Sequence, residues 1–82
     1  MEREVEVGQP EGLHARPAAE FVRLASKFQA RVRVRYRDRE ADARSIISVL
    51  SLGASQGARV ILSAEGEEAE AALEALAGFL AG

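Results

Sequence analysis

The sequence predicts an α/β fold of the α+β type: an open-faced β-sandwich in which three helices cover one side of a four-stranded antiparallel sheet. Three observations lead to this architecture. Two segments alternate regularly between charged and apolar residues, as strands with one buried side do. Three other segments repeat apolar residues at helical spacing. Along the chain the elements follow the order β-α-β-β-α-β-α, in one domain spanning residues 1–82.

The first two predicted strands have the clearest patterns. In residues 2–7, Val5 and Val7 fall on one side and glutamates on the other. In residues 31–36, three arginines alternate with three apolar residues. Because successive side chains of a strand point to opposite faces, each segment predicts a strand that is half-buried.

The other two strands are less regular. Residues 37–39 (RDR) suit a turn, and the polar residues 40–42 then suit a short strand at a sheet edge. A fourth strand is predicted over residues 59–65, although Ile61 interrupts its alternation, and Gly66 ends it.

Three helices are predicted from their apolar spacing and their ends. The first begins at Ala15 and runs for about three turns, with Pro17 tolerated because amides of the first turn have no intrahelical acceptor. The second is a two-turn helix, since Ser45 suits an N-cap and Gly53 a C-terminal stop. The third carries an apolar stripe over residues 69–80, preceded by glutamates that complement the helix dipole.

Composition removes several classes of function. The net charge of −2 argues against a general nucleic-acid binder. With no cysteine and one histidine, the chain lacks the nitrogen and sulfur ligands of a zinc or iron site. No apolar run approaches the ~20 residues of a membrane span, and no signal pattern opens the chain. We therefore expect a soluble cytoplasmic protein with no metal and no membrane insertion.

One short motif holds the residue best suited to chemistry. Residues 12–17 (GLHARP) place the only histidine next to an arginine at the predicted start of a helix. Near neutral pH a histidine has a ring nitrogen available as a nucleophile. A phosphoryl group on His14 would be stabilised by unpaired amides of the first turn and by the Arg16 guanidinium. From the residues alone, a lone histidine here is more often structural or merely exposed, so both interpretations stay open.

Two motifs together carry a family resemblance. Residues 12–18 (GLHARPA) and residues 44–47 (RSII), the latter followed by SLG at 51–53 and QG at 56–57, lie about thirty residues apart. In these motifs the chain resembles the HPr family, the histidine-containing phosphocarriers of the phosphoenolpyruvate-dependent sugar phosphotransferase system. The predicted element order is also the fold of that family, and the resemblance covers nearly the whole chain.

The resemblance implies a carrier that is itself phosphorylated, not an enzyme, and that needs no cofactor. His14 would accept a phosphoryl group on Nδ1 from phosphorylated enzyme I, which takes it from phosphoenolpyruvate. It would then pass the group to sugar-specific IIA proteins or domains. Arg16 would stabilise the phosphoryl group. Glu11 departs from the small polar residue common at that position in the family, and a solvated loop charge is the simplest interpretation of it.

Ser45 has two compatible roles. As an N-cap it stabilises the second helix by about 1 kcal/mol. In some members of the family the matching serine is phosphorylated by an ATP-dependent kinase, and the product acts as a corepressor with a transcription regulator. The resemblance thus implies a regulatory serine here, with a serine kinase/phosphorylase as a further partner.

The second helix is apolar on more than one face, so it cannot turn all its apolar side chains toward one core. Val49 and Leu52 are predicted to face the core. The remaining apolar residues would form an exposed patch near His14, where the resemblance implies that partners dock. The residues predicted to form this partner-binding patch are Leu13, Ile46, Ile47 and Leu50.

Three alternatives remain beside the carrier function. A regulatory binding module of the same family, active in corepression or in nitrogen or carbon signalling, would have no need of His14 or Arg16. A nucleic-acid module would use the arginines of residues 31–39, but no aromatic residues are interleaved to stack bases. A hydrolase would need a base-oriented nucleophile, and no aspartate or serine is placed to complete one. A monomer fits a carrier that must expose one site to successive proteins.

Overall fold

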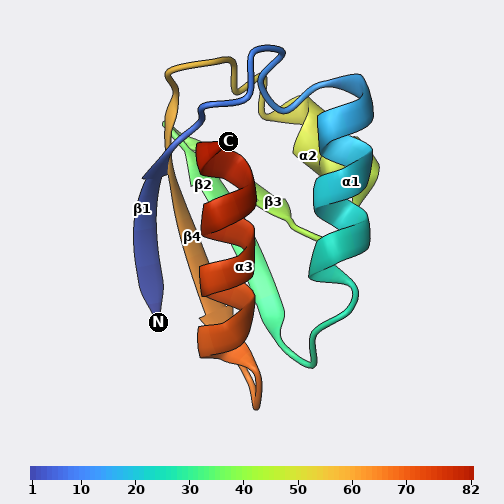
Figure 1. Ribbon diagram of the computed structural model, residues 1–82, viewed down its shortest axis with the longest axis vertical. Coiled ribbons are helices and arrows are strands. Elements are labelled where there is room, and N and C mark those ends of the chain that lie inside the picture. The colour runs from blue at the N-terminus through green and yellow to red at the C-terminus, as the bar shows by residue number, and fades with distance from the viewer.

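The computed structural model describes residues 1–82 and contains the seven predicted elements in the predicted order (Figure 1). The strands are β1 (Glu2–Glu6), β2 (Arg31–Tyr36), β3 (Arg39–Asp42) and β4 (Arg59–Glu65), and the helices are α1 (Ala15–Ala25), α2 (Ile46–Ser51) and α3 (Ala69–Ala81).

The four strands form one antiparallel sheet in the order β1-β4-β2-β3. Val34 in β2 pairs with Leu62 in β4 and with Ala41 in β3, and all three side chains are buried. Val5 of β1 pairs with Val60 on the same face. The three helices lie together on this face and leave the other one open (Figure 1). The predicted open-faced sandwich is therefore confirmed.

The core lies between the sheet and the helices. It is a single cluster of 23 buried apolar residues, and no polar or charged side chain is buried. Phe21 of α1 is fully buried and meets the ring of Phe79 of α3 at a centroid distance of 6.3 Å. Apolar burial drives the folding of such a small domain. The core forms only when the three helices pack against one another and against the sheet.

Two strand boundaries differ from the prediction. β1 ends at Glu6, and Val7 is fully buried in the segment that follows, where its amide donates to the carbonyl of Ala58 at 2.8 Å. β3 begins at Arg39 because Arg39 pairs with Tyr36 in the β2–β3 ladder. The turn is therefore a two-residue hairpin loop, and its first residue, Arg37, has a φ of 58°.

The ends of α2 agree with the prediction. The hydroxyl of Ser45 accepts a hydrogen bond from the amide of Ser48 at 3.3 Å, as an N-cap does. Gly53 follows the helix with a φ of 67°, a conformation that glycine adopts without strain. No helix in the chain has the length and apolar character that crossing a membrane requires.

The open face of the sheet carries charges of both signs. The exposed arginines of β2 have acidic neighbours in β3: Arg33 and Glu40 form an ion pair of 2.8 Å, and Arg35 pairs with Glu40 in the ladder. Beyond β4, the edge strand β1 presents Glu4 and Glu6. The arginine row thus lies within a mixed-charge surface, with acidic strands at both edges.

Candidate functional site

The loop between β1 and α1 brings the predicted motif to one end of the molecule. At its tip the amide of Gly12 donates to the carbonyl of Gln9 at 2.9 Å. Gly12 has a φ of 68°, and a Cβ there would lie 2.6 Å from the carbonyl oxygen of Ala54. Only glycine allows this approach of two backbone segments. The loop is therefore held against the segment that follows α2.

His14 is the N-cap of α1. Its backbone is extended, with φ −124° and ψ 160°, and its carbonyl accepts the amide of Ala18 at 3.3 Å. The imidazole makes no capping hydrogen bond, and the residue is exposed. The side chain is therefore free at the surface.

The first turn of α1 carries free donors in the residues that follow His14. The amides of Ala15 and Arg16 have no intrahelical acceptor, and Pro17 has no amide proton. Arg16 is exposed and forms no ion pair, so its guanidinium is available to an anion. The structure thus brings the imidazole, two free amides and a free guanidinium to one helix end.

Ala15 has an unusual backbone. Its φ is 42°, in the left-handed region that residues with a Cβ seldom adopt. Such a conformation costs free energy and persists only where the surrounding structure fixes it. Before Ala15 in the chain, the amide of Leu13 is hydrogen-bonded to the carbonyl of Ala54, and after it Pro17 is buried. The chain is therefore fixed on both sides of the strained residue. The sequence motif gave no sign of this strain.

The placement of Leu13 in the exposed patch was wrong. Leu13 is fully buried and belongs to the hydrophobic core. Its amide donates to the carbonyl of Ala54 at 2.8 Å, which fixes the backbone so that the side chain points inward while His14 points outward. Burial of a leucine side chain stabilises the fold by about 2 kcal/mol, so this residue secures the loop and offers no contact surface.

The apolar patch consists of residues from α2. Ile47 is 71% exposed and Leu50 is 37% exposed, whereas Ile46 is only partly exposed and packs against the core. Val49 and Leu52 face the core, as predicted. α1 and α2 contact each other and lie side by side in Figure 1, and Leu13, next to His14, is hydrogen-bonded to Ala54, which follows α2. The patch therefore belongs to the helix that neighbours the one capped by His14.

Two arginines hold α2 in place, and the sequence did not reveal this role. The Arg39 guanidinium donates to the carbonyl of Ser51, the last residue of α2, at 2.8 Å. Arg44, just before the helix, donates to the carbonyl of Phe28 at 2.8 Å. Neither contact has a signal in the local pattern, because each joins segments more than ten residues apart.

The chain has no cluster of side chains suited to hold a metal ion.

Comparison with known proteins shows the family to which the chain belongs. The family model described as "PTS HPr component phosphorylation site" matches residues 1–82. The chain belongs to the HPr family. The phosphocarrier protein HPr of Streptomyces coelicolor is 47% identical over 81 residues, covering 98% of this chain and 87% of that protein. HPr of Buchnera aphidicola is 40% identical, covering 93% of this chain and 89% of that protein.

The solved structures agree with the sequence comparison. The crystal structure of HPr from Bacillus anthracis matches with a TM-score of 0.96 at 38% identity, and the match covers 98% of this chain and 95% of that one. Members of this family are phosphocarriers of the phosphotransferase system, and the fold described above is that of HPr. The resemblance noted in the two sequence motifs is therefore confirmed for the chain as a whole.

Proposed function

We propose that the protein is a cytoplasmic phosphocarrier in which His14 receives a phosphoryl group on Nδ1 from phosphorylated enzyme I and passes it to IIA proteins or domains. The nitrogen attacks phosphorus as the bond to the donor breaks, so the group moves without consuming water. The observation that carries the proposal is the exposed His14 at the N-terminus of α1, beside two unbonded amides and the free Arg16, in a member of the HPr family.

The electrostatics of the helix end suit this role. A phosphoryl group on His14 adds negative charge next to the positive end of the helix dipole. The amides of Ala15 and Arg16 can donate to its oxygens, and the guanidinium can add a charge-assisted bond. These contacts would stabilise the phosphorylated form until an acceptor docks.

The patch formed by Ile47 and Leu50 supports docking of the donor and acceptor proteins. Both side chains are exposed. Covering them with a partner protein would remove apolar surface from water and so stabilise the complex. The patch is small, so the complexes it forms would be transient, as a carrier that serves several partners requires. Docking there would bring a partner's reacting group to the adjacent end of α1.

Regulation through Ser45 is part of the proposal. Its hydroxyl caps α2 and is partly exposed. A phosphate on this residue would lie at the N-terminus of a helix, which accommodates negative charge. We therefore expect phosphorylation by a serine kinase to change the charge beside the apolar patch without unfolding α2, and so to weaken docking or to recruit a transcription regulator.

The deciding experiment is transfer from phosphoenolpyruvate through enzyme I of the same host. The expected product is an acid-labile, alkali-stable phosphoryl adduct on the wild-type protein, with its phosphorus resonance assigned to Nδ1 by NMR. His14→Ala abolishes it, whereas Ser45→Ala retains it. A folded wild-type protein that stays unlabelled while a control HPr is labelled by the same enzyme I would overturn the carrier function and favour the regulatory module.

A further inference from the structure

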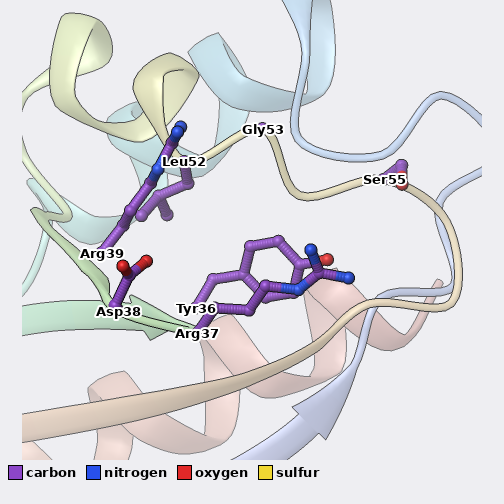
Figure 2. Close-up of a pocket in the computed structure, with 7 residues that line it drawn as sticks. All are labelled: Tyr36, Arg37, Asp38, Arg39, Leu52, Gly53 and Ser55. Carbon is purple, nitrogen blue, oxygen red and sulfur yellow. The ribbon is translucent and has the colours of Figure 1, made fainter.

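We propose that the hollow between the β2–β3 hairpin and the segment after α2 binds a small phosphate-bearing anion, at a site separate from His14. The hollow has a volume of about 410 Å³, within the range of small-ligand sites. Figure 2 shows its two walls: the hairpin on one side and the chain leaving α2 on the other. The residues that line it are Tyr36, Arg37, Asp38, Arg39, Leu52, Gly53 and Ser55.

Arg37 provides the main anchor for an anion. Its guanidinium carbon lies 5.1 Å from the centroid of the Tyr36 ring, over which it stacks (Figure 2). Stacking uses the face of the guanidinium and leaves the N–H groups at its edge free. Arg37 forms no hydrogen bond or ion pair within the protein. A planar, oriented and unpaired guanidinium is the group best suited to bind two oxygens of a phosphate at once.

The backbone at Arg37 supports a role for its side chain. Its φ of 58° is a hairpin conformation in which glycine or asparagine would be less strained. An arginine here costs free energy that turn formation alone does not require. The strained backbone directs the side chain along the ring of Tyr36 and so toward the hollow (Figure 2).

Arg39 adds a second positive charge on the same wall. One of its terminal nitrogens donates to the carbonyl of Ser51 at 2.8 Å, so its side chain is held in place while other N–H groups remain free. Asp38 is the one acidic residue in the lining, so the two arginines leave a net charge of +1. The hydroxyls of Tyr36 and Ser55 make no hydrogen bond within the protein and can donate to a ligand.

The other hollows lack this combination. One of similar size contains Arg31 and Arg44 together with two acidic residues, Asp42 and Glu65, so its charges balance. The third is only about 150 Å³, and its Arg33 is already paired with Glu40. Excess positive charge and sufficient volume therefore coincide only at the hairpin hollow.

The test is a titration of the ¹⁵N-labelled protein with inorganic phosphate at neutral pH and constant ionic strength. We expect the amide signals of Arg37, Gly53 and Ser55 to shift along one saturable curve in the millimolar range. The same titration with glycerol phosphate, a phosphate monoester, distinguishes two kinds of ligand. If it binds more tightly than inorganic phosphate, the rest of the hollow contacts the ligand and a larger phosphorylated molecule is favoured. Equal affinities favour a free anion. Phosphate bound beside His14 is recognised separately, because Arg16→Gln removes it and leaves the hairpin shifts unchanged.

Three variants make the test decisive. Arg37→Gly removes the guanidinium while suiting the positive φ, so the fold is retained and the affinity at the hairpin falls by about fivefold or more. Asp38→Asn removes the opposing charge and should tighten binding. Arg35→Gln, on the open sheet face, is the matched control and should leave binding unchanged. Shifts that do not saturate, or an affinity unaffected by Arg37→Gly, would overturn the proposal.

Discussion

The amide of Leu13 donates to the carbonyl of Ala54 at 2.8 Å, and this bond joins the loop that carries His14 to the segment that follows α2. This hydrogen bond explains why two consecutive residues differ in burial. Leu13 is drawn into the core, while His14, the next residue, is turned out to solvent as the N-cap of α1. The phosphoryl acceptor proposed here is thus oriented by a contact between segments about forty residues apart.

The close approach behind this bond can be tested at Gly12. Gly12→Ala should lower the free energy of unfolding by about 2–3 kcal/mol, because a Cβ meets backbone atoms and the residue has a positive φ. Gly53→Ala is the control, since it also has a positive φ but nothing lies within 4 Å of its added Cβ. That variant should cost only about 1 kcal/mol. Equal losses in urea unfolding would contradict the role of the close approach.

Arg16 should affect transfer and not stability. It is exposed and makes no ion pair, so Arg16→Ala should leave the unfolding transition within about 0.5 kcal/mol of the wild type. Losing its charge-assisted bond should slow phosphoryl transfer from enzyme I by about tenfold to a hundredfold, as followed by rapid-quench labelling. Arg35→Ala, with its side chain on the open face, serves as the control. A rate equal to that of the control would remove Arg16 from the site.

Substitutions at Ile47 and Val49 of α2 distinguish effects on partner docking from effects on folding stability. Ile47→Lys should raise the KM for enzyme I by about tenfold with little change in stability, because the side chain is 71% exposed. Val49→Ala should lower the free energy of unfolding by about 2 kcal/mol, since that side chain is fully buried, and should leave the KM of the folded protein unchanged. The docking proposal fails if Ile47→Lys transfers phosphate with an unaltered KM.

The two roles of Ser45 can be distinguished by a pair of substitutions. Ser45→Ala loses the hydrogen bond from the Ser48 amide and should destabilise the protein by about 1 kcal/mol, measured by thermal unfolding. Ser45→Asp keeps a capping oxygen and should be nearly as stable as the wild type. If charge at this position regulates docking, only Ser45→Asp should weaken transfer from enzyme I. Equal transfer by both variants would argue against regulation through charge.

Local patterns were sufficient for the elements and for the family. Alternation located β2, the predicted bounds of β4 were correct although its alternation is interrupted, and the Ser45 and Gly53 signals located both ends of α2. These succeed because strand pleating, helix periodicity and capping depend on residues close together in the chain. The motif around His14 likewise indicated a helix end with a nucleophile. Boundaries at Val7 and Arg39 were missed by one residue, because pairing with another strand or segment decided them.

The sequence by itself therefore determined the order of elements, the buried faces of β1, β2 and β4, and the residues of the motif in which we propose the phosphoryl acceptor. Only the tertiary structure decided that Leu13 is buried beside an exposed His14, that Ala15 is strained, and that Arg37 stacks over Tyr36 at the edge of a hollow. The first group depends on contacts within one turn or one strand. The second depends on which distant backbone segments meet, and no local pattern encodes that meeting.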